Sequence, residues 1–112
     1  YAASRADVTF HGRALGGSGV WSMDQRFEEA ARLKPTHVTV LIGANDLGDG
    51  SYPTTRAWLD ALWAYAARWR ALGAEVAVGT VLPVCMPGEQ FAAYTARHAE
   101  RRREANAAIR SA

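Results

Sequence analysis

The sequence of 112 residues is 49% hydrophobic and 21% charged, which allows one small hydrophobic core and excludes an intrinsically disordered chain. Its net charge of +2 comes from arginines dispersed among acidic residues, so the charge does not indicate a nucleic-acid partner. The longest apolar runs are too short to span a membrane, and the single cysteine, Cys85, allows no internal disulfide.

The amino-terminal third predicts a strand, a glycine loop and a helix. Residues Asp7–His11 have the composition of a short strand, and Gly16–Gly19 follow as a loop. A helix with an apolar face should run over Ser22–Leu33, because Ser22 is a good capping residue and Pro35 prevents continuation of the helix.

The middle of the chain predicts a strand that runs directly into polar residues. Val38–Ile42 are apolar or β-branched, which is typical of a buried parallel strand. Ligands of open α/β sheets bind beyond the carboxyl ends of such strands. There, Gly43 allows a sharp turn and the amide of Asn45 could donate to developing negative charge. We expect Leu47–Pro53 to form a loop rich in Gly and Asp.

The carboxyl-terminal half predicts a helix, a strand and a second helix. The first helix begins at Thr54 or Thr55, carries large apolar side chains three and four residues apart, and stops at Gly73. We expect Glu75–Pro83 to be the next strand and Glu89–Ser111 the last helix. Alternating strands and helices are the pattern of an α/β protein with a doubly wound parallel sheet.

Two glycine-containing segments, Gly16-Gly17-Ser18-Gly19 and Gly43-Ala44-Asn45-Asp46, each follow a predicted strand. The second segment matches the Gly-x-Asn-Asp block of the SGNH hydrolases, also called the GDSL family of esterases and lipases. The first resembles that family's second block. Residues 75–83 resemble the family's next core strand and residues 106–110 the helix before its final block, so the resemblance spans nearly the whole chain.

The resemblance implies a three-layer, flavodoxin-like doubly wound fold and the hydrolysis of carboxylic esters. It assigns two donors of an oxyanion hole, the backbone N–H of Gly19 and the side-chain amide of Asn45, and it gives Asp46 a structural hydrogen-bonding role. The implied substrate is a small-molecule ester. Neither a metal nor an organic cofactor is implied.

Two blocks of the family's catalytic machinery do not occur in the sequence: the Gly-Asp-Ser block with the nucleophile, and the Asp-x-x-His block. We therefore interpret residues 1–112 as a single partial SGNH-hydrolase-like domain and expect the chain alone to be inactive. We also expect an unpaired sheet edge to permit self-association. The alternative is a degenerate, non-catalytic interaction module that kept the scaffold and lost the chemistry.

Other interpretations of these residues are weaker. Asn45 by itself could be a turn residue that bonds to its own backbone. The glycine loop does not match a phosphate-binding loop, since Ser18 follows Gly17 where lysine is required. A rearranged triad using Ser18, Ser22 or His11 is disfavoured, because a serine within the oxyanion loop is badly placed to attack the carbon whose oxygen that loop binds.

We expect the remaining polar residues to lie on the surface and the remaining aromatic residues to pack in the core, rather than to form a functional site. No two histidines share the spacing of a helical zinc site, and we expect His37 and His98 on the surface. Arg101–Arg103 should form a solvated helix face. The aromatic residues at helical spacing in Trp58–Trp69 should pack in the core and at its rim.

Overall fold

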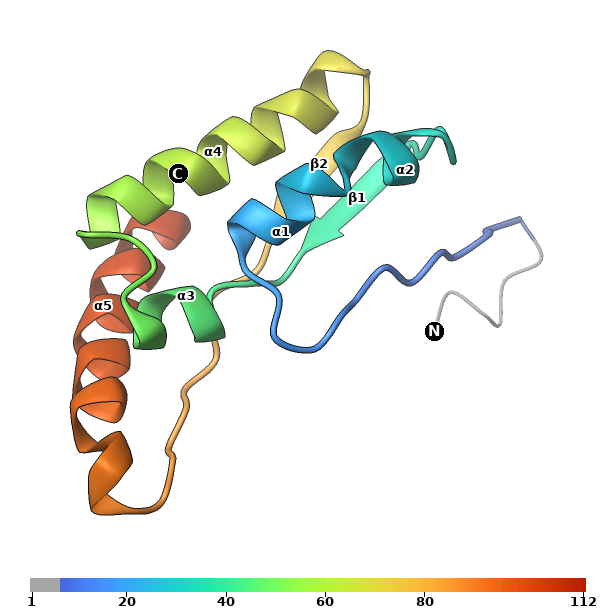
Figure 1. Cartoon of the computed structure of the whole chain (residues 1–112). Helices are drawn as coiled ribbons and strands as arrows, with labels where there is room; N and C mark the ends of the chain where they lie inside the picture. Colours follow the sequence, from blue (N-terminus) through green and yellow to red (C-terminus); the bar gives the residue numbers. More distant parts are fainter. Residues whose placement is uncertain (1–6) are drawn as a thin grey trace.

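The computed structural model describes residues 7–112, in which helices and two strands alternate along the chain (Figure 1). In chain order the elements are α1 (Val20–Gln25), α2 (Phe27–Ala31), β1 (His37–Val40), α3 (Ala44–Asp49), α4 (Thr55–Ala71), β2 (Glu75–Val78), the short 3-10 helix η2 (Glu89–Phe91) and α5 (Ala92–Ser111). None of these helices is both long and apolar enough to cross a membrane.

The two strands form a parallel sheet. Val38 pairs with Val76 and Val40 with Val78, and α3 and α4 lie between the two strands in the sequence. A parallel pair requires such a crossover connection, because the chain must return to the starting end of the first strand. The predicted α/β class is confirmed in this unit.

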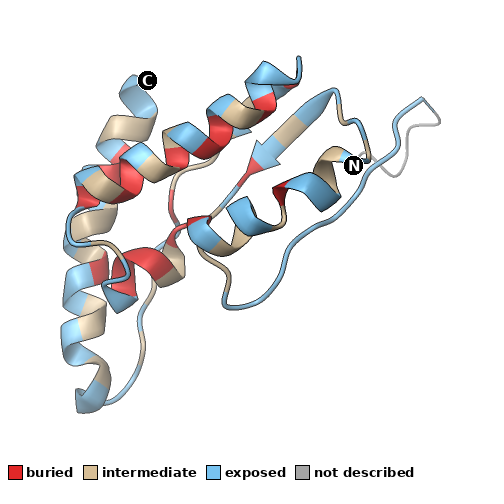
Figure 2. Cartoon of the chain, turned by 45° about the horizontal axis from the view of Figure 1, so that its top comes forward, coloured by how far each residue is buried: buried red, intermediate tan, exposed pale blue. Residues whose placement is uncertain are grey.

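One face of the sheet is covered and the other is open. Val40 is buried, and the other three strand valines pack against the same core. The alternating residues Thr39 and Leu41 are exposed, Leu41 at 61%. In Figure 2 exposed residues alternate with intermediate and buried ones along β1. The expectation of a buried parallel strand over Val38–Ile42 is therefore met on one face only among residues 7–112, because the helices that contact the sheet cover a single face.

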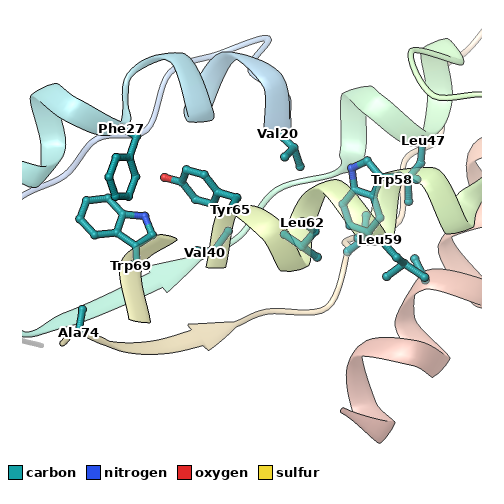
Figure 3. Close-up of a cluster of buried hydrophobic side chains, with 12 residues drawn as sticks. Val20, Phe27, Val40, Leu47, Trp58, Leu59, Leu62, Tyr65, Trp69 and Ala74 are labelled. Atoms are coloured by element: carbon teal, nitrogen blue, oxygen red, sulfur yellow. The ribbon is translucent and has the colours of Figure 1, made fainter. Parts of the chain in front are cut away.

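The core lies between the covered face and the helices α1, α2 and α4 (Figure 3). At one end Phe27 and Trp69 have ring centroids 4.4 Å apart, and Tyr65 meets both rings edge to face. At the other end Trp58 and Leu47 are fully buried. Burial of each large apolar side chain stabilises the fold by about 1.5–3 kcal/mol.

α4 begins and ends within one residue of its predicted limits. The Oγ1 of Thr54 caps it by accepting the N–H of Ala57 at 3.1 Å, and Gly73 provides the left-handed turn (φ +86°) that follows it. Of the large apolar side chains at helical spacing, Trp58, Leu62, Tyr65 and Trp69 face inward as expected. Leu72, the last of that series, is 60% exposed, because it caps the end of the helix beyond the core. The core-facing residues of α4 are Trp58, Leu59, Leu62, Tyr65, Ala66 and Trp69.

The predicted strand Asp7–His11 is not formed. This segment is exposed, with Phe10 at 74%, and it runs apart from the sheet (Figure 1). β1 pairs only with β2 among residues 7–112, so this segment has no neighbouring strand there. A strand cannot satisfy its own backbone groups, and strand composition alone therefore does not produce one.

The predicted helix Ser22–Leu33 is present as α1 and α2. It begins earlier than expected, at Val20, because the backbone N–H of that residue is held by a carboxylate from α3. The interruption is at Arg26, whose N–H bonds to the carbonyl of Met23, three residues back. This tighter pairing closes the last turn of α1 as a 3-10 turn.

The predicted loop Leu47–Pro53 is helical in its first part. α3 includes Leu47, which is fully buried, and ends where Gly50 adopts a left-handed conformation (φ +76°). No helical period can be recognised over so short an element. Burial of Leu47, rather than helix propensity, therefore accounts for α3.

The predicted strand Glu75–Pro83 ends at Val78. Beyond it, the N–H and C=O of Val81 bond to the side-chain amide of Asn106, at 2.7 and 3.0 Å. This amide on α5 thus satisfies backbone groups that a neighbouring strand would otherwise pair. The predicted last helix, Glu89–Ser111, is confirmed as η2 followed by α5.

Candidate active site

The fold brings the glycine loop and Asn45 together from positions 27 residues apart. The side-chain Nδ2 of Asn45 donates to the carbonyl of Ser18 at 3.1 Å. Asn45 reaches this point because Gly43 turns the chain sharply at the end of β1, with φ +125°. A Cβ at Gly43 would lie 2.6 Å from the ring of Trp58, so both the backbone angle and the packing require glycine.

Asp46 joins the two segments firmly. Its buried carboxylate accepts the backbone N–H of Val20 and the indole N–H of Trp58, each at 2.9 Å. A Cβ at Gly19 would lie 2.0 Å from Oδ1 of this carboxylate, which leaves room only for glycine there. The structural role expected for Asp46 is confirmed, and the carboxylate fixes α1 against both α3 and α4.

Gly19 and Asn45, the two residues predicted to be oxyanion donors, both have hydrogen-bond partners in this structure. The N–H of Gly19 donates to the hydroxyl of Ser22 at 2.9 Å, and that hydroxyl donates back to the carbonyl of Gly19 at 3.0 Å. The peptide between Ser18 and Gly19 is trans, so its N–H points away from the carbonyl that Asn45 holds. One amide hydrogen of Asn45 remains after the bond to Ser18.

A serine nucleophile is not assembled among residues 7–112. The hydroxyl of Ser22 is committed to the backbone of Gly19, and the buried hydroxyl of Ser18 has no hydrogen-bond partner. Neither hydroxyl bonds to a histidine, and His11 lies in the exposed amino-terminal segment. The same part of the chain holds no group of three metal-ligating side chains.

His98 was expected on the surface and is instead fully buried on α5. Neither ring nitrogen has a hydrogen-bond partner among residues 7–112. Desolvation by burial, followed by the neighbouring guanidinium of Arg102, lowers the pKa of His98 below its usual 6.5. The residue is therefore a neutral core side chain, whereas His37 is exposed beside Glu75, as predicted for a surface histidine.

Several α5 residues that contact the site region were not predicted from the sequence. Arg101 was expected to be solvated but donates to the carbonyls of Tyr52 and Pro53, at 2.7 and 2.9 Å. Tyr94 and Arg97 donate to carbonyls of α3. The one available signal was their spacing of three to four residues on a single helix face, which their polarity obscured.

Comparison with known proteins identifies a family. The family model of the GDSL-like Lipase/Acylhydrolase family matches residues 1–112. No curated protein and no solved structure matches the chain. The matched region contains both the glycine loop and the Gly43–Asp46 turn, which lie in contact in the fold. The chain therefore belongs to the GDSL-like lipase/acylhydrolase family, whose family-level chemistry is ester hydrolysis.

Proposed function

We propose that this chain supplies the oxyanion-binding segment of an SGNH-type serine ester hydrolase with a three-layer, doubly wound sheet. The donors are the backbone N–H of Gly19 and the side-chain amide of Asn45. The observation that supports this proposal is the hydrogen bond from Asn45 Nδ2 to the carbonyl of Ser18. That carbonyl belongs to the same peptide as the N–H of Gly19, so the two proposed donors are neighbours in the fold.

In this proposal a serine outside these 112 residues attacks the ester carbonyl, and a histidine outside them moves the proton. Negative charge then develops on the carbonyl oxygen. Asn45 donates its second amide hydrogen to that oxygen. The N–H of Gly19 leaves the hydroxyl of Ser22 and donates to the same oxygen. Because the two donors face opposite sides of the Ser18–Gly19 peptide in the structure, the exchange requires a local rotation of this peptide.

Asp46 supports the same chemistry indirectly. The carboxylate holds Val20, the residue after the proposed donor, and belongs to the residue after Asn45. Each donor is thus one residue away from a buried hydrogen bond. These bonds hold the residues on either side and confine the required rotation to the Ser18–Gly19 peptide.

The test is Asn45→Ala in the protein that carries the nucleophile. We expect kcat to fall about a hundredfold to a thousandfold with little change in KM, because the donor acts mainly on the transition state. Gln90→Ala removes an exposed amide from η2 and should leave kcat unchanged. A folded Asn45→Ala enzyme with wild-type kcat would contradict the proposal and favour the non-catalytic module.

We also propose that the 112-residue chain alone hydrolyses no ester above background. Purified chain should turn over no p-nitrophenyl acetate and should not be labelled by a serine-directed phosphonate. Stoichiometric labelling of Ser18 or Ser22 together with turnover would show that a nucleophile is present after all.

The open face of the sheet supports a further part of the proposal, self-association of the isolated chain. Leu41, which directly follows β1, is 61% exposed, and Leu82, four residues beyond the end of β2, is 59% exposed. Each strand also has one unpaired edge among residues 7–112. Size-exclusion chromatography with light scattering should show oligomers that increase with concentration, whereas a monomer at all concentrations would contradict this part.

A further inference from the structure

Two side chains of α5 hold α3, the helix that carries Asn45. The phenol of Tyr94 donates to the carbonyl of Ala44 at 3.2 Å, and Arg97 Nη1 donates to the carbonyl of Gly48 at 3.0 Å. The Ala44 carbonyl belongs to the peptide that also contains the nitrogen of Asn45. The phenol is thus bonded to the backbone at the base of the proposed donor.

The surface of α3 fits these two side chains closely. A Cβ at Gly48 would lie 2.2 Å from Cζ of Tyr94, and a Cβ at Gly50 would lie 3.0 Å from Nη1 of Arg97. Gly48 lies within the helix and its φ is not positive, so the backbone conformation does not require glycine there. Glycine costs about 1 kcal/mol relative to alanine inside a helix. Glycine is required at position 48 because the ring of Tyr94 occupies the space that a side chain would need.

α3 depends on such contacts for its position. It has six residues, and helices this short are unstable without tertiary contacts. Burial, and secondarily the carboxylate of Asp49, raise the pKa of Tyr94 above its usual 10. The phenol therefore keeps its proton near neutral pH and remains a donor.

We propose that Tyr94 is a positioning residue for the oxyanion donor Asn45, with Arg97 holding the far end of the same helix. The inference rests on the proposed function of Asn45. Tyr94 does not touch the substrate. It acts by fixing the peptide from which the Asn45 side chain projects, and small displacements of a catalytic donor are costly in rate.

The test is a double-mutant cycle of Tyr94→Phe and Asn45→Ala in the protein that carries the nucleophile. Tyr94→Phe removes the hydroxyl and keeps the ring against Gly48. We expect it to lower kcat about tenfold and change KM by less than about twofold. In the Asn45→Ala background the same change should have no further effect on kcat. Tyr65→Phe, in the aromatic cluster at the other end of the core, is the matched control and should keep wild-type kcat.

The cycle separates two kinds of failure. If Asn45→Ala lowers kcat but Tyr94→Phe has no effect, or has the same effect in both backgrounds, the positioning role of Tyr94 is refuted and the function of Asn45 stands. If Asn45→Ala leaves kcat unchanged, the proposed function fails, and the positioning role fails with it.

A second measurement needs no activity. In the 112-residue chain, hydrogen exchange of the Leu47 amide, which bonds to the carbonyl of Gly43, reports on the first turn of α3. Tyr94→Phe should accelerate this exchange about tenfold relative to amides in the middle of α4, and Tyr65→Phe should not. Equal exchange in wild type and Tyr94→Phe would overturn the inference.

Discussion

Different interactions stabilise the two ends of the core. At one end, aromatic rings of α2 and α4 pack against one another over the sheet (Figure 3). At the other, hydrogen bonds tie α1, α3, α4 and α5 to one another and to the chain after β2. The carboxylate of Asp46 and the amide of Asn106 make buried bonds, and Tyr94 makes a partly buried one. Apolar contacts are non-directional and contribute mainly stability. Hydrogen bonds are directional and fix the positions of the groups that they join.

Deleting the central ring of the aromatic end should have the largest effect on stability. Trp69 is 2% exposed and contacts both other rings of the cluster. Trp69→Ala should lower the free energy of unfolding by about 3–5 kcal/mol in denaturant titrations, through lost burial and a cavity. Trp21, which is 67% exposed, provides the control. If Trp21→Ala cost as much as Trp69→Ala, the aromatic end would not be the main source of stability.

Changing the carboxylate at the polar end should have a smaller effect on stability. Asp46→Asn replaces an anion that accepts two buried hydrogen bonds with a group that also brings two donors. We expect a loss of about 1–3 kcal/mol in the free energy of unfolding. Asp49→Asn, on the exposed end of α3, should be nearly neutral in the same titration. Equal losses for the two variants would show that burial of the Asp46 carboxylate is not important.

The aromatic end could be predicted from the sequence, whereas most of the polar end could not. The inward face of α4 follows from apolar residues three and four positions apart, which is a local pattern. The bond from Tyr94 joins residues 50 positions apart, and its donor lies on a helix rich in arginine and alanine. No local period marks such a contact. His98 was misplaced for the same reason, since a lone polar residue carries no sign of its burial.

Gly19 and Asn45 form an intermediate case. Both residues could be identified from the sequence motifs. Their positions relative to each other depend on the tertiary fold and could not. The sharp turn at Gly43 was predicted from residue type, and the structure has it at φ +125°. The engagement of the Gly19 N–H with Ser22 was not predicted, because it depends on where α1 begins.

The buried histidine, His98, makes the stability of the fold depend on pH. Its pKa is lowered in the folded state, so the unfolded chain binds the proton more readily. Stability should therefore be undiminished above about pH 6.5 and fall as the pH drops below that value towards the folded-state pKa, by at most about 1.4 kcal/mol per pH unit. Denaturant titrations at several pH values check this. The slope should be lost in His98→Gln and kept in His37→Gln, and a slope that survives His98→Gln would show that other groups cause it.

The smallest effect is expected at the rim of the aromatic end. The guanidinium of Arg68 lies 3.9 Å from the ring centroid of Phe27 and pairs with Asp24 and Glu28. These groups are partly exposed, so Arg68→Met should cost about 0.5–1 kcal/mol at low salt, and less at high salt. A loss as large as that of Trp69→Ala would show that charge, rather than ring packing, stabilises this end.

The most direct test of the central claim is the structure of a phosphonate adduct of the nucleophile-carrying protein. The adduct places a negatively charged tetrahedral oxygen where the oxyanion of the reaction forms. We predict that the N–H of Gly19 leaves the hydroxyl of Ser22 and that both it and the Asn45 amide lie within about 2.7–3.1 Å of that oxygen. An adduct in which Gly19 still donates to Ser22 and Asn45 still donates only to Ser18 would contradict the assignment of the oxyanion hole.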